Sequence, residues 1–114
     1  FNDGNTYIAG FSQGAMVAIW TALIRKRALA GCFSFSGLAA ADVYLDKQIS
    51  SRPKVYLLHG KKDTQVLFKC LNFTAEWLKS EHVPVSTKSF DNLGHELSEP
   101  ELDFITEVMN GNQA

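Results

Sequence analysis

The sequence predicts an α/β fold with a parallel sheet of about four strands, because short β-rich runs alternate with helical patterns. Parallel pairing with right-handed crossovers is the default for that order of elements. A second observation is the continuous apolar run at 55–58 between Pro53 and Gly60, typical of a strand buried on both faces. The length of 114 residues allows one domain at most, so we expect a single domain over 1–114.

The first half of the chain predicts a strand, a turn and a helix, over residues 6–9, 10–14 and 15 to about 29. The helix is indicated by apolar residues at helical spacing, namely Met16, Ile19, Trp20 and Leu23. Its other faces are also apolar, so we expect it to be deeply packed. The basic run 25–27 falls near the predicted C-terminus, where cations match the helix dipole.

The second half predicts strands at 32–35, 55–58 and 85–90, with a long connection over 38–53 that has room for one helical turn. An amphipathic helix before Pro84 is indicated by Leu67, Cys70, Leu71, Thr74, Trp77 and Leu78. The last helix begins with a capping box from Ser98 to Glu101 and ends near Gly111. Its apolar stripe consists of Leu102, Ile105, Val108 and Met109.

The composition is that of an ordinary globular protein, with 46% apolar residues, 20% charged residues and a net charge of −1. Disorder, collagen and coiled coil are excluded, and the balanced charge argues against nucleic-acid binding. No stretch could span a bilayer and no signal peptide is visible, so we expect no stable membrane insertion and a cytoplasmic location. Cys32 and Cys70 lack disulfide-scaffold and metal-ligand spacing, and we expect both to be buried structural thiols.

The segment Gly10-Phe11-Ser12-Gln13-Gly14 fits the pattern G-x-S-x-G, with a predicted strand before it and a predicted helix after it. A serine at such a tight turn is held in a strained conformation above the carboxyl edge of the sheet. The helix N-terminus would favour developing negative charge, with the Gln13 N–H as one oxyanion donor. The plainer alternative is a βα turn in which Ser12 only caps the helix.

A reactive serine needs a base, and the base needs an orienting carboxylate. Asp63 and His95 each follow a predicted strand, which places them at the same sheet edge as Ser12. The order Ser12, Asp63, His95 is that of the α/β-hydrolases. We therefore predict Ser12 as nucleophile, His95 as base and Asp63 as the acid that orients it, with Asp91 as a minor alternative acid.

The remaining candidates fit less well. His59 ends a predicted strand beside Gly60, so we expect it to pack or to hydrogen-bond locally. His82 lies in the turn before Pro84, at the opposite edge of the sheet, and should be solvated. Glu96 neighbours the predicted base and is expected to face solvent or the last helix.

The chain resembles the C-terminal half of an α/β-hydrolase, a three-layer αβα fold, and most closely the phospholipase/carboxylesterase group that includes acyl-protein thioesterases. The segments that carry the resemblance are 10–16, His59-Gly60-Lys61-Lys62-Asp63 and Gly94-His95-Glu96. It implies a partial catalytic domain in which Ser12, Asp63 and His95 act through an acyl-serine intermediate, with no metal or organic cofactor. Where the family usually has Pro-Val-Val after the acid, this chain has 64–66 as Thr-Gln-Val, so acyl-chain preference is not carried over.

The resemblance implies a carboxylic ester hydrolase acting on a small-molecule or lipid ester or thioester. The alternatives are a serine peptidase of the same fold, or a catalytically incompetent fragment that serves as an interaction module. The chain begins at Phe1 with loop residues directly before a strand, which indicates a fragment. The family's early strands and the loop with its second oxyanion donor would precede it. We therefore expect the 6–9 strand to be a free edge that pairs with the missing N-terminal half as a second chain, or with another copy.

Overall fold

The computed structural model describes residues 3–37 and 49–111, so the predicted helical turn in the 38–53 connection lies largely outside the described residues. Four parallel strands form one sheet in the order β1-β2-β3-β4. Their bounds are β1 (Tyr7–Phe11), β2 (Gly31–Phe35), β3 (Val55–Gly60) and β4 (Val85–Phe90). The predicted parallel α/β sheet is confirmed. Because the strands are parallel, the carboxyl ends of β1, β3 and β4, which precede the candidate residues, all lie at the same end of the sheet.

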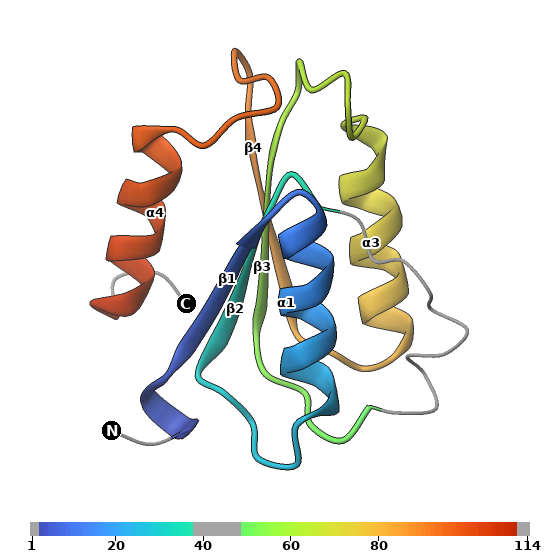
Figure 1. The fold of residues 1–114 in the computed structure, drawn as a ribbon, viewed down its shortest axis with the longest axis vertical. Helices are drawn as coiled ribbons and strands as arrows, with labels where there is room; N and C mark the ends of the chain where they lie inside the picture. The colour runs from blue at the N-terminus through green and yellow to red at the C-terminus, as the bar shows by residue number, and fades with distance from the viewer. Residues whose placement is uncertain (1–2, 38–48, 112–114) are drawn as a thin grey trace.

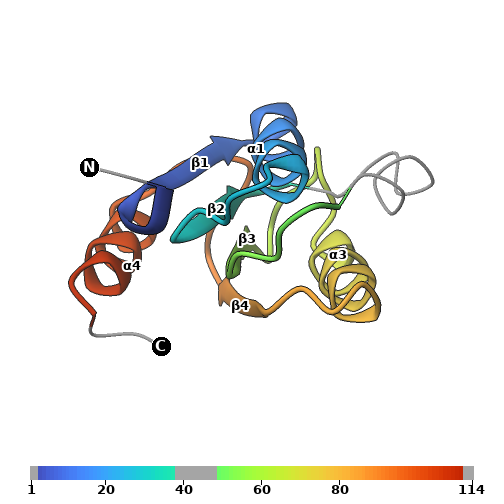
Figure 2. The same ribbon diagram turned by 90° about the horizontal axis from the view of Figure 1, so that it is seen from below.

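In the part of the chain that the structure describes, three helices flank the sheet, after a short 3-10 turn at Asp3–Asn5. They are α1 (Gln13–Ile24), α3 (Lys69–Ser80) and α4 (Glu99–Met109). Helices α1 and α3 cover one face of the sheet and α4 lies on the other, as the two views of the ribbon show (Figures 1 and 2). The arrangement has the three layers that the resemblance to α/β-hydrolases implied.

The two faces of the sheet are packed differently, because side chains alternate along each strand. Toward α1 and α3, Cys32, Val55 and Leu57 pack against aliphatic helix residues such as Ile19 and Leu78. Toward α4 the packing is mainly aromatic, formed by Phe33, Phe35, Tyr56, Leu58 and Val108, with Phe104 and Ile105 packed against them. Every residue of β2 and β3 is buried, which confirms the prediction for the apolar run at 55–58.

Helix α1 ends at Ile24, so the prediction of a helix to about Leu29 was wrong. Arg25 already has extended backbone (ψ 142°), and its guanidinium pairs with Asp3 instead of facing a helix C-terminus. The chain must leave the helix here to return to Gly31, where β2 begins. The predicted match between the basic residues and the last helical turn therefore does not occur.

The expected deep packing of α1 is found only on the face that meets the sheet. Val17 is 59% exposed and Trp20 is 44% exposed, whereas Ile19 and Leu23 are fully buried. Residues three or four apart lie on one helix face, so the exposed positions form an apolar face directed away from the sheet. We call Val17, Trp20 and Ile24 the α1 outer face.

Helix α3 begins at Lys69, so Leu67, the first residue of the predicted stripe, lies before the helix and is 48% exposed. Its buried positions are Leu71, Thr74, Ala75 and Leu78. Cys32 is buried as predicted, and burial raises the pKa of its thiol to about 12. Cys70 is only partly buried, so that part of the prediction was wrong: it lies at the side of the stripe that packs on the sheet.

Helix α4 has the predicted capping box. The Glu101 N–H donates to Ser98 Oγ (3.4 Å), and the Ser98 N–H donates to Glu101 Oε1 (3.0 Å). Gly111 follows the helix with φ +81°, a conformation that favours glycine. The predicted stripe was partly wrong, because Leu102 and Met109 are about half exposed and the helix packs instead through a neighbouring face. The residues of that face are Glu101, Phe104, Ile105 and Val108.

Candidate active site

Ser12 sits at the junction between β1 and α1 in a strained backbone conformation (φ 57°, ψ −117°). Such a conformation costs on the order of 1–3 kcal/mol and persists only where the surroundings hold it. The Ser12 N–H donates to the Phe35 carbonyl (2.8 Å), which extends the pairing of β1 with β2 up to the turn. The predicted strained strand-to-helix turn is therefore present.

The two glycines of the G-x-S-x-G pattern do not contribute equally. A Cβ at Gly10 would lie 2.1 Å from the Gly14 carbonyl oxygen, so only glycine fits there. A Cβ at Gly14 would meet nothing within 4 Å. The close approach of strand and helix therefore depends on Gly10, and the described residues give no steric reason for glycine at Gly14.

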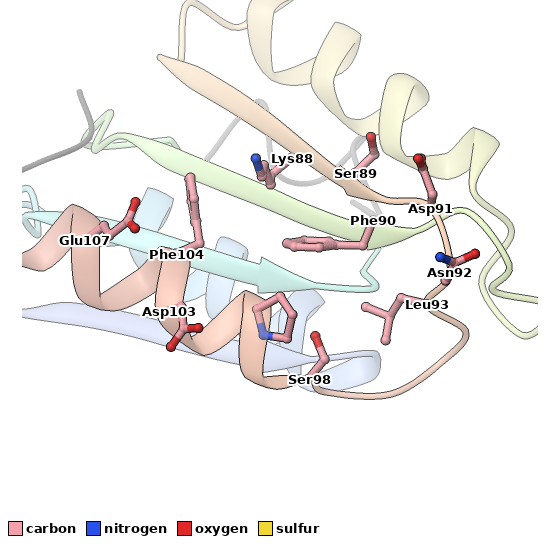
Figure 3. A pocket seen from close by; sticks show the side chains of 11 residues that line it. Lys88, Ser89, Phe90, Asp91, Asn92, Leu93, Ser98, Asp103, Phe104 and Glu107 are labelled. Atoms are coloured by element: carbon pink, nitrogen blue, oxygen red, sulfur yellow. The ribbon is translucent and has the colours of Figure 1, made fainter.

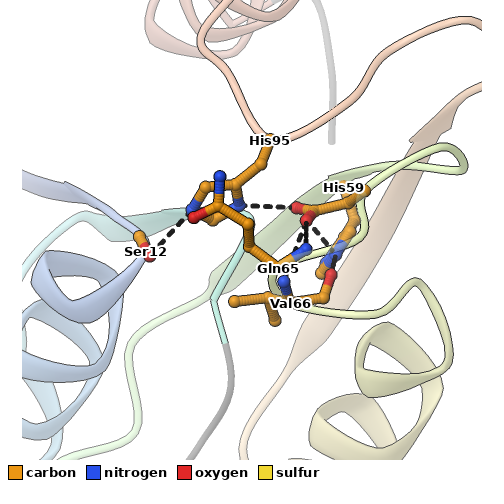
Figure 4. Close-up of polar contacts among 6 residues, drawn as sticks. Ser12, His59, Gln65, Val66 and His95 are labelled. Carbon is orange, nitrogen blue, oxygen red and sulfur yellow. Dashed lines mark hydrogen bonds and ion pairs between the residues drawn. The ribbon is translucent and has the colours of Figure 1, made fainter.

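The Ser12 hydroxyl does not cap α1, which argues against the plainer alternative. Its Oγ lies 3.0 Å from Nε2 of His95, on the loop that follows β4 (Figure 4). The ring of Phe11 packs against the imidazole, with 4.8 Å between the ring centroids. Ser12 Oγ thus faces a ring nitrogen of His95, and Phe11 at the end of β1 supports one side of that ring.

The loop that carries His95 is tied to the loop after β3. The Lys62 N–H donates to the Leu93 carbonyl (3.0 Å), and the Lys61 N–H donates to the Phe90 carbonyl (2.9 Å). Leu93 is buried, and a Cβ at Gly60 would lie 2.1 Å from its carbonyl oxygen. The absence of a side chain at Gly60 therefore lets the two loops approach closely.

Asp63 occupies that second loop and is 3% exposed. Its Oδ1 accepts hydrogen bonds from the Gln65 and Val66 N–H groups, both at 2.9 Å. Its Oδ2 lies 2.8 Å from Nδ1 of His95. Burial by itself would raise the pKa of Asp63, but the hydrogen bonds from His95, Val66 and Gln65 and the nearby imidazole together hold that pKa below its ordinary value.

These contacts define the imidazole tautomer. An ionised carboxylate can only accept, so Nδ1 of His95 carries the proton that faces Asp63. In the neutral ring Nε2 is then an acceptor, and the Ser12 hydroxyl donates to it. The arrangement can draw a proton from the serine oxygen and hold the resulting imidazolium against a buried negative charge.

The alternative acid, Asp91, lies elsewhere. Its side chain is 78% exposed and pairs with Lys61 (2.9 Å), which lowers the pKa of the carboxyl group. His82 and Glu96 are exposed, as expected. The structure therefore brings Ser12 and His95 together with Asp63, and not with Asp91.

Sequence reasoning missed part of the surroundings of Asp63. His59 packs and hydrogen-bonds locally as expected: it is 1% exposed, and its Nε2 lies 2.7 Å from the Val66 carbonyl oxygen. The same Nε2 is also 3.4 Å from Oδ2 of Asp63. The only signal for this contact in the sequence is the four-residue spacing between His59 and Asp63. That spacing predicts a side-chain contact in a helix, but not where a strand passes into a loop.

Gln13 begins α1, so its N–H is among the first four of the helix, which have no partner within the helix. Gln13 directly follows Ser12, which is the position expected for an oxyanion donor. Among residues 3–37 and 49–111, no cluster of three His, Cys, Asp or Glu side chains could hold a metal ion. No helix in the same part of the chain is long and apolar enough to cross a membrane.

A cavity of about 650 Å³ lies between β4 and α4 (Figure 3). Leu93 and Ser98, which flank His95 in sequence, line it, but Ser12, Asp63 and His95 do not. The other lining residues are Lys88, Ser89, Phe90, Asp91, Asn92, Pro100, Asp103, Phe104 and Glu107. The cavity is therefore separate from the three side chains that form the hydrogen-bonded series.

Comparison with known proteins gives a consistent picture. A family model described as Phospholipase/Carboxylesterase matches residues 2–112. A probable carboxylesterase, SOBER1-like, from Arabidopsis thaliana is 29% identical over 107 residues, which are 91% of this chain and 41% of that protein. Lysophospholipase-like protein 1 from Mus musculus is 37% identical over 100 residues, which are 84% of this chain and 42% of that protein.

The crystal structure of esterase PE8 superposes with a TM-score of 0.90 and 30% sequence identity. The superposition covers 97% of this chain and 52% of that one. The chain therefore spans about half the length of the relatives it matches. The region covered is their C-terminal part, which confirms the expected half of an α/β-hydrolase fold.

Proposed function

This chain belongs to the phospholipase/carboxylesterase family, and from that premise we propose that the protein is a serine hydrolase of carboxylic esters or thioesters. The observation that carries the proposal is the continuous series from Ser12 Oγ through His95 to Asp63, with distances of 3.0 and 2.8 Å. The names of the relatives, which include a probable carboxylesterase and a lysophospholipase-like protein, support the substrate class.

In the proposed reaction, His95 Nε2 takes the proton from Ser12 while Oγ attacks the carbonyl carbon of the substrate. The tetrahedral intermediate collapses when the same nitrogen gives the proton to the departing alcohol or thiol, which leaves an acyl-Ser12 ester. Water then attacks that ester with His95 as base, and the second intermediate collapses as His95 returns the proton to Ser12 Oγ and the free acid leaves. Asp63 stays ionised and stabilises the imidazolium in both halves of the reaction.

The negative oxygen of the intermediate needs hydrogen-bond donors. We assign one to the Gln13 N–H, because it lies at the positive end of α1 beside the serine. Loss of a single oxyanion donor costs about 10²–10³ in rate. The resemblance implies that the second donor comes from the part of the fold that is not in this chain, so the proposal concerns the full-length protein.

Substrates are proposed to be small-molecule or lipid esters or thioesters. Every step uses a side chain or a backbone N–H of the protein, and the proposal includes no cofactor. The cytoplasmic location expected from the sequence stays a prediction, which fractionation of cells that express the tagged protein would test.

We also propose that the edge of β1 receives further polypeptide. Within residues 3–37 and 49–111, β1 pairs only with β2, and a hollow of about 640 Å³ lies beside it, lined in part by Tyr7, Ile8 and Leu29. The α1 outer face exposes apolar side chains on the helix that follows β1. A parallel strand that has a partner on one edge only, next to an apolar face, favours association with another strand along its other edge. The proposed occupant is the N-terminal half of the fold that the resemblance implies, or another copy of the chain.

The test of the proposed activity uses the full-length protein with an acyl p-nitrophenyl ester, an acyl thioester and a peptide anilide as substrates. We expect hydrolysis of the ester or thioester, and its loss in Ser12→Ala. Cleavage of the peptide alone would favour the peptidase alternative. No cleavage of any of the three by folded protein would favour the incompetent interaction module.

A further inference from the structure

His59 is a buried histidine that the proposed chemistry does not use. It lies in β3, one residue before the strand ends, and its side chain is 1% exposed. Its ring makes an edge contact with Phe68, with 5.9 Å between the centroids. Polar groups are rarely buried so fully without a partner, so the partners of His59 indicate what it does.

The partners of His59 all belong to the turn that carries Asp63. Its Nε2 lies 2.7 Å from the Val66 carbonyl oxygen. A carbonyl only accepts, so Nε2 carries the proton and donates it to Val66. The Val66 N–H in turn donates to Oδ1 of Asp63 (2.9 Å). Val66 is therefore held at its carbonyl by His59 while its N–H holds the carboxylate, as the dashed lines in Figure 4 show.

The same proton also lies near the other carboxylate oxygen. Oδ2 of Asp63 is 3.4 Å from Nε2 of His59 and 2.8 Å from Nδ1 of His95. The longer distance makes this an electrostatic contact and not a full hydrogen bond. It places two imidazole N–H groups around the oxygen that orients the proposed base.

We infer that His59 is a positioning residue that fixes the turn over 63–66 and so holds Asp63 in the orientation that His95 requires. This inference rests on the proposed function. The carboxylate must direct Oδ1 to the turn amides and Oδ2 to His95, and a rotation of the turn would lengthen the second contact. Because Asp63 and His59 are both almost fully buried, water cannot replace the lost donor. Misplacement of a reacting group by about 1 Å can cost about 10²-fold in rate.

The test compares His59→Phe with His59→Gln in the full-length protein. Phenylalanine keeps an aromatic ring beside Phe68 but has no donor, whereas the glutamine amide can reach the position of Nε2. We expect His59→Phe to lower kcat by about 10- to 100-fold with KM nearly unchanged. We expect His59→Gln to remain within a few-fold of the original enzyme.

A merely structural role would instead lower the thermal stability of both variants without separating their kcat values. Equal kcat for the two folded variants would overturn the inference. If His59→Phe does not fold, His59→Asn replaces it, because the shorter amide does not reach the Val66 carbonyl. The kcat of His59→Asn is then compared with that of His59→Gln, and equal values would again overturn the inference.

A second measurement does not depend on turnover. The His95 Nδ1 proton, held against Asp63, should give a far-downfield proton resonance that identifies the tautomer. We expect this signal to persist in His59→Gln and to be lost or broadened in His59→Phe. If the original protein hydrolyses no ester, the proposed function fails, while this resonance still tests the positioning. An unchanged resonance in His59→Phe would overturn the inference in either case.

Discussion

His95 Nε2 lies 3.0 Å from Ser12 Oγ, although the two residues are 83 positions apart in the chain. The contact depends on two parallel strands whose carboxyl ends lie on the same side of the molecule. β1 ends just before Ser12, and β4 ends before the loop that carries His95. Between them the loop after β3 carries Asp63, which completes the series. β1 and β4 are the outer strands of the described sheet, so the contact also requires the loop after β4 to reach back toward β1.

The first prediction concerns the nucleophile. Because Ser12 alone faces His95 from a strained turn, a fluorophosphonate probe should label Ser12 in the full-length protein. Mass spectrometry of the labelled peptides identifies the site, and Ser12→Ala should remove the label. Ser36, which also has positive φ (54°) at the end of β2, provides the control, because Ser36→Ala should still be labelled. Label on any other serine would contradict the assignment.

The second prediction concerns the acid. In Asp63→Asn the amide oxygen should keep the two backbone donors, which turns the NH₂ group toward His95. His95 would then adopt the tautomer with its proton on Nε2 and could not accept from Ser12. We expect kcat to fall by about 10⁴-fold. The measurement is steady-state hydrolysis of an activated ester.

Asp91→Asn is the matched control for that substitution. Asp91 is exposed and its partner is Lys61, so we expect kcat close to that of the original protein. If Asp91→Asn is inactive while Asp63→Asn is not, the orienting acid is Asp91.

The third prediction separates the two glycines of the G-x-S-x-G pattern. In Gly10→Ala the new methyl group would overlap the Gly14 carbonyl, so strand and helix must move apart. We expect a loss of about 1–3 kcal/mol in the free energy of unfolding, together with loss of Ser12 labelling. Gly14→Ala enters open space in a helix, where alanine is favoured by about 1 kcal/mol. Chemical denaturation measures both, and equal effects would contradict the steric argument.

The fourth prediction concerns Glu101, a fully buried carboxyl group in the first turn of α4. Burial raises its pKa, hydrogen bonds from Ser98 oppose that shift, and the charge of Glu96 adds to it. The folded chain therefore binds this proton more tightly than the unfolded chain, where a glutamate titrates near ~4.3. The stabilising contribution is present below that value and is lost as pH rises through the raised folded pKa.

Glu101→Gln should remove that loss, because glutamine keeps the capping box without a charge. We expect the melting temperature of the variant to depend less on pH between about pH 4 and 8. Glu99→Gln, in the same helical turn but exposed, serves as control and should leave the pH dependence unchanged. A steeper pH dependence in Glu101→Gln would show that the sign assigned here is wrong.

The fifth prediction concerns the β1 edge and the α1 outer face. The isolated 12.6 kDa chain should associate in sedimentation velocity experiments, because the outer edge of β1 lies beside exposed apolar side chains. Charged residues at Val17 and Trp20 should shift it toward the monomer. Phe73 is as exposed as Val17 but lies on α3, away from β1, so Phe73→Glu is the control and should have little effect. A compact monomer that unfolds cooperatively at high concentration would defeat the prediction.

Features encoded over a few neighbouring residues could be predicted from the sequence. The bounds of β4 agree with the prediction at both ends, and the capping box of α4 has both of its hydrogen bonds. The strained turn at Ser12 follows from a strand, a glycine-flanked serine and a helix in direct succession. In each case the determining contacts are local, so the pattern and the structure contain the same information.

Only the tertiary structure decided the choices that depend on distant parts of the chain. Asp63 and Asp91 both follow strands at the carboxyl end of the sheet, and the choice between them depends on how the loop after β4 docks on the loop after β3, which brings His95 to Asp63. The early end of α1 is set by the chain's return to β2. Val17 is exposed because the sheet covers the opposite face of α1. The role of His59 depends on a turn that folds back on it. A one-dimensional pattern records which residues could meet at an edge, but hydrogen-bond partners are fixed by distances that exist only once the sheet has formed.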